Sequence, residues 1–303
     1  MPTPRVAAIH DLSGFGRCSL TVAIPVLSAM GVQCCPLPTA VLSTHTGGFE
    51  GYTFRDLTEE MAAAAAHWKA LDLRFDAVYS GFLGSERQID LVRQFLRDFR
   101  RPGTLAVVDP VMGDFGRVYE TYTPAMCRRM ADLTAEADVI TPNLTEAALL
   151  LGVPYESLPR DEAGLKALTE KLGCPGRRSV TLTGVSLAEG KTGAMCYDAG
   201  KNTCRPVQTE RVDREFLGTG DVFASVLTGA LVRGGGLLDA AAQEAEALPQ
   251  EPPELSPRHG RSMRAMLRDP LAWARSRRRP ALRTAARHAA ARHAAAVLLV
   301  LVL

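Results

Sequence analysis

The sequence has no apolar run long enough to cross a membrane. A helical span needs about 20 mostly apolar residues, whereas the apolar stretch at the carboxyl terminus, VLLVLVL, has only seven. The amino-terminal residues MPTPRVAAIH also lack the charged and then apolar build of a secretory signal peptide. These absences predict a cytoplasmic protein with no membrane partner.

The sequence also has no Cys-x-x-Cys pair and no cysteine spacing typical of a metal site. Its seven cysteines are Cys18, Cys34, Cys35, Cys127, Cys174, Cys196 and Cys204. An odd number in a chain of 303 residues predicts free, mostly buried thiols in a reducing compartment.

Acidic residues are scarce near the carboxyl terminus. The net charge of the chain is +2, but from Arg258 onward there are eleven arginines and one acidic residue, Asp269. This region is rich in Ala, Arg and Pro, a composition that rarely builds a core. It indicates either a basic appendage, able to bind nucleic acid or another anionic surface non-specifically, or the frame-shifted remainder of a GC-rich gene.

From residue 5 to about residue 234, short β-branched runs alternate with helical patterns. This alternation predicts a mostly parallel sheet with helices on both faces. Ligands of such sheets gather at the carboxyl ends of the strands. Polar residues follow the predicted strands at 10–11, 44–47, 81–82, 109–114, 141–143 and 183–184. For His10 and His45, packing, hydrogen bonding and catalysis all stay open.

Two glycine-rich stretches suggest nucleotide-binding motifs but fail on context. The stretch GFGRCS at 14–19 lacks the acidic residue about 20 positions later that a dinucleotide fold requires. The stretch GVSLAEGKT at 184–192 has five residues between its glycines, where a P-loop has four, and it leads into a strand pattern.

The stretch GTGD at 218–221 opens a helical pattern. Backbone N–H groups at a helix start can bind an anion, and Asp221 could accept the proton of an attacking hydroxyl while they hold a phosphoryl group. A helix start with an ordinary first-turn acid is the alternative.

Six stretches together resemble the ribokinase-like superfamily, and within it the vitamin B6 (pyridoxal/pyridoxamine) kinases. They occur in the family's order: AAIHDLSGFGRCS, STHTG, YSGF, VVDPVMGD, ITPNLTEAALLLG and GTGDVFAS. The resemblance implies a three-layer α/β/α fold with a mostly parallel central sheet. It also implies transfer of phosphate from ATP to the 5′-hydroxymethyl group of pyridoxal, pyridoxamine or pyridoxine in B6 salvage.

The resemblance further implies roles for individual residues. Asp221 is the catalytic base, and Gly218, Thr219 and Gly220 form the anion hole. The residues implied in substrate binding are Asp11, Ser13, Thr46 and Phe82. Those implied in ATP binding are Asp114, Asn143, Glu146, Thr183 and Val212. Mg²⁺ is placed near Asp109, Thr141 and Glu146, with a monovalent cation as a further candidate. Residues 115–122 resemble a flap that covers the substrates.

The resemblance ends before the chain does. It divides the chain into a kinase domain at 1–247, whose carboxyl-terminal part is incomplete, and a divergent tail at 248–303 that is disordered or loosely helical. Three alternatives remain: a hydroxymethylpyrimidine kinase, a sugar kinase of the same superfamily, or an impaired fold-mate that binds B6 vitamers. The family's habit implies a homodimer.

Overall fold

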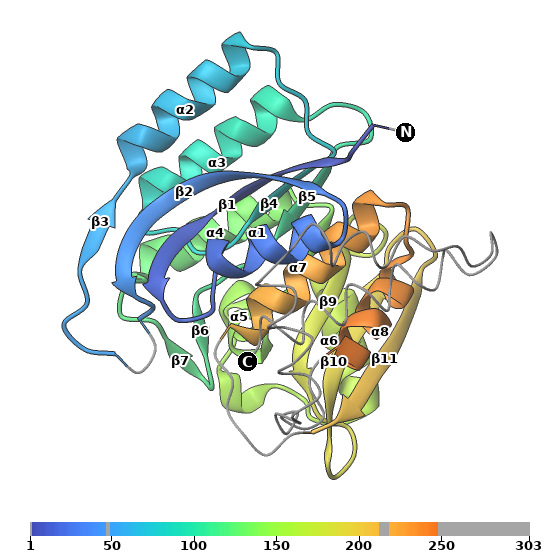
Figure 1. Ribbon diagram of the computed structural model, residues 1–303. Coiled ribbons are helices and arrows are strands. Elements are labelled where there is room, and N and C mark those ends of the chain that lie inside the picture. The colour runs from blue at the N-terminus through green and yellow to red at the C-terminus, as the bar shows by residue number, and fades with distance from the viewer. Residues whose placement is uncertain (1, 47–48, 212–217, 248–303) are drawn as a thin grey trace, which may run out of the picture. The chain divides into compact units, whose positions relative to one another are not determined.

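A nine-stranded sheet forms the centre of the computed structural model, which describes residues 2–46, 49–211 and 218–247 (Figure 1). The strand order is β11-β10-β9-β8-β5-β4-β1-β2-β3. The six strands from β9 to β2 are parallel, and β3, β10 and β11 pair antiparallel at the two sides. The strands are β1 (Arg5–Phe15), β2 (Gln33–Thr44), β3 (Phe54–Asp56), β4 (Ala77–Ser80), β5 (Leu105–Val108), β8 (Val139–Ile140), β9 (Ser179–Val185), β10 (Lys191–Asp198) and β11 (Thr203–Glu210).

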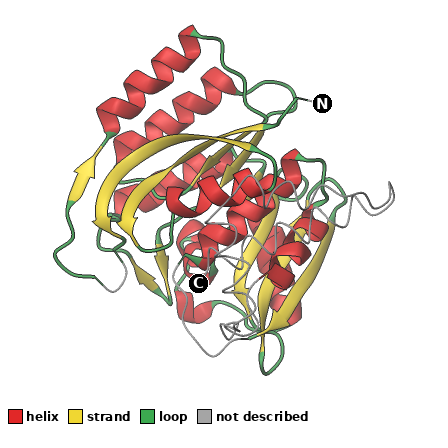
Figure 2. Ribbon diagram, viewed as in Figure 1, coloured by secondary structure: helices red, strands yellow, loops and turns green. Residues whose placement is uncertain are grey.

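Helices cover both faces of this sheet, so the predicted three-layer α/β/α fold is confirmed (Figure 2). One face packs against α2 (Thr58–Ala70), α3 (Glu86–Phe99), α4 (Pro124–Ala135), α5 (Leu144–Leu151) and α6 (Glu162–Gly173). The other packs against α1 (Leu20–Ala29), α7 (Thr219–Val232) and α8 (Leu237–Ala247). Each of the two hydrophobic clusters lies between the sheet and one layer of helices and forms the core that the two share.

The helix boundaries follow from local capping. The Ser85 side chain accepts a hydrogen bond from the N–H of Gln88 and so caps α3, as the sequence predicts. Gly152 takes a left-handed conformation, with φ of 65°, and ends α5 where the pattern stops. The stretches KTGAMCYDAG and NTCRPVQTE have the pattern of a β-hairpin or meander, and they form the antiparallel pair β10–β11.

Short elements and cysteine burial differ from the sequence prediction. The prediction lacked β3, the 3₁₀ turn at Tyr155–Ser157 and the two-stranded sheet of β6 (Gly113–Asp114) and β7 (Arg117–Val118). All seven cysteines are free, but only Cys196 is buried, so the expectation of mostly buried thiols is wrong. Cys34, Cys35 and Cys204 lie on β2 and β11, near the sides of the sheet, where the sulfur is incompletely covered.

The first compact unit of the chain is Met1–Glu246. Among the residues described, no helix has the length and apolar character that crossing a membrane requires. The predicted tail at 248–303 lies outside the described residues.

Candidate active site

The register of the parallel strands brings four polar strand ends into one row. Ile9 pairs with Ser80, Ser80 with Val108, and Val108 with Ile140. The next residue on each strand therefore lies at the same edge, and these residues are His10, Gly81, Asp109 and Thr141. Backbone hydrogen bonds continue the row, since the N–H of Asp109 donates to Ser80 O and that of Thr141 to Val108 O. The predicted clustering at this edge is confirmed for these strands.

The GTGD stretch meets this edge through the start of α7. Gly218 is the N-cap of the helix and has a φ of 80°. A Cβ atom on Gly218 would lie 1.8 Å from the carbonyl oxygen of Arg17, so only glycine allows this approach. The helix start thus packs directly on the loop between β1 and α1. This contact carries Asp221 to the end of β1.

Asp221 lies among other acidic groups. Its side chain is 14% exposed, and its Oδ1 lies 4.0 Å from Nδ1 of His10. Burial, ahead of the nearby Asp11 carboxylate, raises the pKa of Asp221 to about 7, although a hydrogen bond from the N–H of Ser19 opposes the shift. Burial, followed by the Asp221 carboxylate, raises the pKa of Asp109 to about 8. The edge therefore holds carboxyl groups that ionise near neutral pH, a property of groups that accept protons in catalysis.

Asp11 is buried on β1, at the irregularity in its pairing with β2, and is held by serine hydroxyls. The Ser13 hydroxyl donates to Asp11 Oδ2 over 2.8 Å, and both groups are buried. Burial raises the pKa of Asp11, while the hydrogen bonds from Ser19 and Ser13 oppose the rise. The hydroxyl of Ser13 therefore orients the Asp11 carboxylate.

Asn143 and Glu146 form a capping box at the start of α5. The Asn143 side chain accepts from the N–H of Glu146, and Glu146 Oε2 accepts from the N–H of Asn143. Glu146 Oε1 also accepts from the N–H of Met112, and Asn143 Nδ2 donates to Gly113 O. The pair therefore fastens the loop after β5 to α5.

The predicted flap at 115–122 contains β7 and the turn before it. Asp114 ends β6, and its Oδ1 accepts from the N–H of Phe115. Phe115 is 75% exposed at the tip of this hairpin. The N–H of Gly116 donates to Thr145 Oγ1, so the hairpin is attached to the same helix start as the loop after β5.

The remaining predicted residues lie at different distances from this centre. Thr46 is half-buried and follows His45, whose ring lies against Gly16 in the loop after β1. The ring of Phe82 is buried in the core beside Tyr122. Thr183 pairs with Asn143, its N–H donating to Pro142 O. Val212 lies outside the described residues.

Two groups beside Asp221 were not assigned from the sequence. His10 was left open, and Ser19 entered only as the last residue of a glycine pattern. The backbone of Ser19 has a φ of 51°, a left-handed value that is uncommon for residues other than glycine. Its N–H points to Asp221 and its hydroxyl to Asp11, which links the two carboxylates. In the sequence, the serine that ends the stretch GFGRCS was the one available indication of this role.

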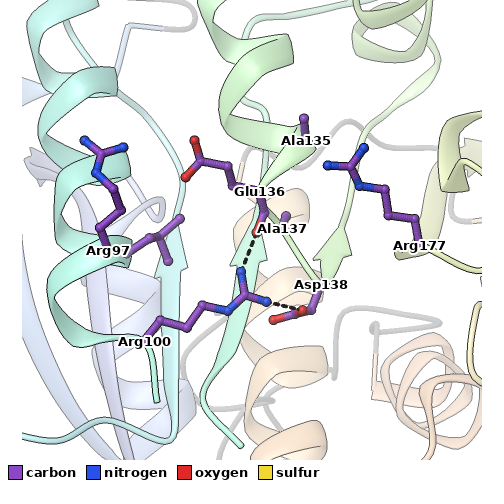
Figure 3. A pocket seen from close by; sticks show the side chains of 8 residues that line it. Arg97, Arg100, Ala135, Glu136, Ala137, Asp138 and Arg177 are labelled. Atoms are coloured by element: carbon purple, nitrogen blue, oxygen red, sulfur yellow. Dashed lines mark hydrogen bonds and ion pairs between the residues drawn. The ribbon is translucent and has the colours of Figure 1, made fainter. Parts of the chain in front are cut away.

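A separate pocket lies at the opposite edge of the sheet (Figure 3). It has a volume of about 500 Å³, and Ala137 and Asp138, which immediately precede β8, are among its lining residues. Arg100 is already paired there with Asp138 and with the carbonyl oxygen of Glu136. Because Ala137 and Asp138 precede β8 whereas Thr141 follows it, and β5 is parallel to β8, this pocket lies at the other end of these strands from Asp109 and Thr141.

The sequence matches a known family over most of its length. The profile of the phosphomethylpyrimidine kinase family matches residues 22–252. Pyridoxal kinase PdxY of Deinococcus radiodurans is 28% identical, over 76% of this chain and 80% of that protein. The chloroplastic thiamine biosynthetic bifunctional enzyme TH1 of Arabidopsis thaliana is 28% identical over 78% of this chain, which spans only 44% of that longer enzyme.

Solved structures of similar proteins have the same fold. A putative phosphomethylpyrimidine kinase from Bacteroides thetaiotaomicron, crystallised with pyridoxal, is 44% identical with a TM-score of 0.77, over 82% of this chain and 86% of that one. Pyridoxal kinase from Lactobacillus plantarum is 32% identical with a TM-score of 0.75, over 82% of this chain and 87% of that one.

The contact at Gly218 predicts the outcome of a paired substitution. Gly218→Ala should lower the thermal midpoint by several degrees and abolish activity, because the new Cβ would collide with Arg17 O. Gly220→Ala is the matched control, since nothing lies within 4 Å of a Cβ there. Thermal unfolding of the two variants measures the difference, and equal midpoints would contradict the described contact.

The raised pKa of Asp109 predicts how stability depends on pH. The folded state favours protonated Asp109, so its stabilising contribution is complete below pH 3.8 and is lost as the pH rises to about 8. Asp109→Asn should therefore raise the thermal midpoint more at pH 8 than at pH 5, in buffer without nucleotide or Mg²⁺. A gain that is the same at both pH values would refute the cause given for the shift.

Proposed function

The chain belongs to the phosphomethylpyrimidine kinase family, and we propose that it transfers the γ-phosphoryl group of ATP to the 5′-hydroxymethyl group of pyridoxal, pyridoxamine or pyridoxine. The observation that carries the proposal is the position of Asp221, a carboxylate in the first turn of α7, at the edge where the parallel strands end. The relatives of known structure include pyridoxal kinase from Lactobacillus plantarum, which supports B6 vitamers as substrates.

Asp221 is the base in this reaction. It accepts the proton of the substrate hydroxyl as that oxygen attacks the γ-phosphorus. Gly218, Thr219 and Gly220 present backbone N–H groups at the start of α7, where the helix dipole favours negative charge. These groups hold the transferring phosphoryl group, as phosphoryl transfer requires positioning and charge stabilisation rather than covalent help.

The buried Asp11 recognises the substrate. Its carboxyl group, fixed by Ser13, can hydrogen-bond the ring nitrogen or the phenolic oxygen of the pyridine. Thr46 contacts the substrate from the loop after β2, and Phe82 supports the site from the core.

ATP and Mg²⁺ would bind beside the row of strand ends that contains Asp109 and Thr141. Among the described residues, no three His, Cys, Asp or Glu side chains are arranged to hold a metal ion. That fits Mg²⁺, which proteins usually bind with one or two carboxylates together with substrate phosphates. Asp109 is the residue that fits a Mg²⁺ ligand. Its carboxyl group is buried and lies close enough to Asp221 for the Asp221 charge, after burial, to raise its pKa. When bound, the ion neutralises phosphate charge. Glu146 and Asn143 contribute to this site by fastening the loop after β5. Thr141, Asp114 and Thr183 lie at neighbouring strand and hairpin ends.

The proposal includes a cytoplasmic location and a homodimer. Leu12 on β1 pairs with Val41 on β2, and both side chains are more than a third exposed, so they form an adjacent pair of exposed apolar groups. This exposure supports contact with a second copy.

A hydroxymethylpyrimidine kinase is the second candidate, because the hydroxymethylpyrimidine/phosphomethylpyrimidine kinase of Rhizobium meliloti is 27% identical over 74% of this chain. Hydroxymethylpyrimidine also offers a hydroxymethyl group on a nitrogen heterocycle. An assay of transfer from Mg-ATP to both substrates separates the two candidates. We expect kcat/KM to favour pyridoxal; preference for hydroxymethylpyrimidine would reverse the assignment.

Asp221→Asn should reduce kcat by about 10²–10⁴-fold, the usual contribution of general base catalysis, with little change in pyridoxal binding. Asp239→Asn is the matched control, because Asp239 is an exposed acid on α8. The measurements are steady-state turnover and calorimetric binding of pyridoxal. Retained turnover in Asp221→Asn would remove Asp221 from the role of base.

The pH dependence of kcat/KM should report the ionisation of Asp221. Only the ionised carboxylate accepts a proton, so activity should rise with pH and reach half of its plateau near pH 7, where burial places the pKa of Asp221. An unperturbed aspartate would give a limb near pH 4. A rate profile that is flat from pH 5 to 8 would be inconsistent with a base in this environment.

A further inference from the structure

His10 lies within the buried part of β1, in a space that fits its ring. The side chain is fully buried. The ring packs edge-on against Tyr79, with 4.3 Å between the ring centroids. A Cβ atom on Gly81 would lie 2.2 Å from Nδ1 of His10, so the absence of a side chain at Gly81 makes room for the imidazole.

Neither ring nitrogen of His10 has a hydrogen-bond partner within the described structure. Burial lowers the pKa of His10 to about 3, so the ring is neutral and its approach to Asp221 is not an ion pair. The Oδ1 atom of Asp221 lies 4.0 Å from Nδ1, about an ångström beyond hydrogen-bond distance. A buried polar group without a partner is costly. An apolar side chain of similar size would pack here without that cost.

We propose that His10 is a positioning residue for Asp221: its neutral imidazole donates Nδ1–H to one oxygen of the Asp221 carboxylate when the substrates bind, which leaves the other oxygen directed at the substrate hydroxyl. The inference rests on the proposed function, in which Asp221 is the base. It explains why a costly histidine stands at a position where packing alone favours an apolar residue.

The surroundings of Asp221 make a neutral donor suitable. Asp11 from β1 and Asp109 from the end of β5 both repel its ionised form, while the N–H of Ser19 already donates to it. Cys18 and Tyr79 also face this carboxylate; burial, followed by the Asp221 charge, raises the pKa of both and keeps them protonated. A second donor fixes the orientation of the carboxylate, and because the imidazole is neutral it leaves the negative charge needed to accept a proton.

Two substitutions at this position test the proposal. His10→Leu removes the donor and both unpaired nitrogens; it should leave the thermal midpoint unchanged or raised, yet lower kcat at least about tenfold, with KM for pyridoxal and ATP within about twofold. His10→Asn places an amide N–H close to the position of Nδ1 and should recover most of the lost kcat. A histidine needed only for packing would give neither the opposite changes in stability and kcat nor the rescue.

The proposal is overturned if His10→Leu keeps the kcat of the unaltered enzyme, if it loses stability together with activity, or if His10→Asn fails to recover kcat. Measuring the unaltered enzyme and Asp221→Asn in the same assay separates this inference from the proposed function. No transfer by the unaltered enzyme, or turnover by Asp221→Asn, defeats the proposed function. An active enzyme, an inactive Asp221→Asn and a fully active His10→Leu defeat the role of His10 alone.

Discussion

Removal of carboxyl groups from water is the constraint on which the site depends. Asp11, Asp109 and Asp221 meet at one edge of the sheet, and each has a pKa raised chiefly by burial. Water would normally stabilise these charges, and here the surrounding chain replaces only part of that stabilisation. Without ligands, the ionised forms of these carboxyl groups are poorly stabilised. Ligands that bring cations or protons to this edge would stabilise them.

The fold supplies this edge through register and close backbone contact. Parallel pairing from β1 to β9 places the ends of successive strands side by side. The contact of Gly218 with the loop after β1 then adds Asp221 from a helix more than 200 positions later in the chain. Both devices lie within the first compact unit, Met1–Glu246.

Sequence patterns predicted the layers and most of the longer elements because these follow from periodicity and capping. The alternation of strands and helices, the cap at Ser85 and the end of α5 at Gly152 are local properties. The β6–β7 hairpin was missed because each strand has two residues, and the bonds that attach it come from Glu146, Asn143 and Thr145 on α5. Such long-range support leaves no local pattern.

The same distinction applies to the site. The order of motifs in the sequence predicted that Asp221 lies close to polar residues at the strand ends. The structure has this arrangement. The functions of His10 and Ser19 depend on a meeting of β1 with α7 that no spacing encodes. For Glu146, the resemblance implied a role in ATP and Mg²⁺ binding but not its hydrogen bonds. Its two carboxylate oxygens accept hydrogen bonds from the backbone N–H groups of Met112 and Asn143.

The central claim is that this edge keeps the Asp221 carboxyl group partly protonated near neutral pH. The most direct measurement is a titration of the aspartate carboxyl ¹³C signals by NMR between pH 3 and 9, in which the Asp221→Asn variant identifies the signal of Asp221. We expect a midpoint near 7, because burial, ahead of the Asp11 carboxylate, raises the pKa of Asp221 to about 7. A midpoint near 4, that of an exposed aspartate, would contradict it.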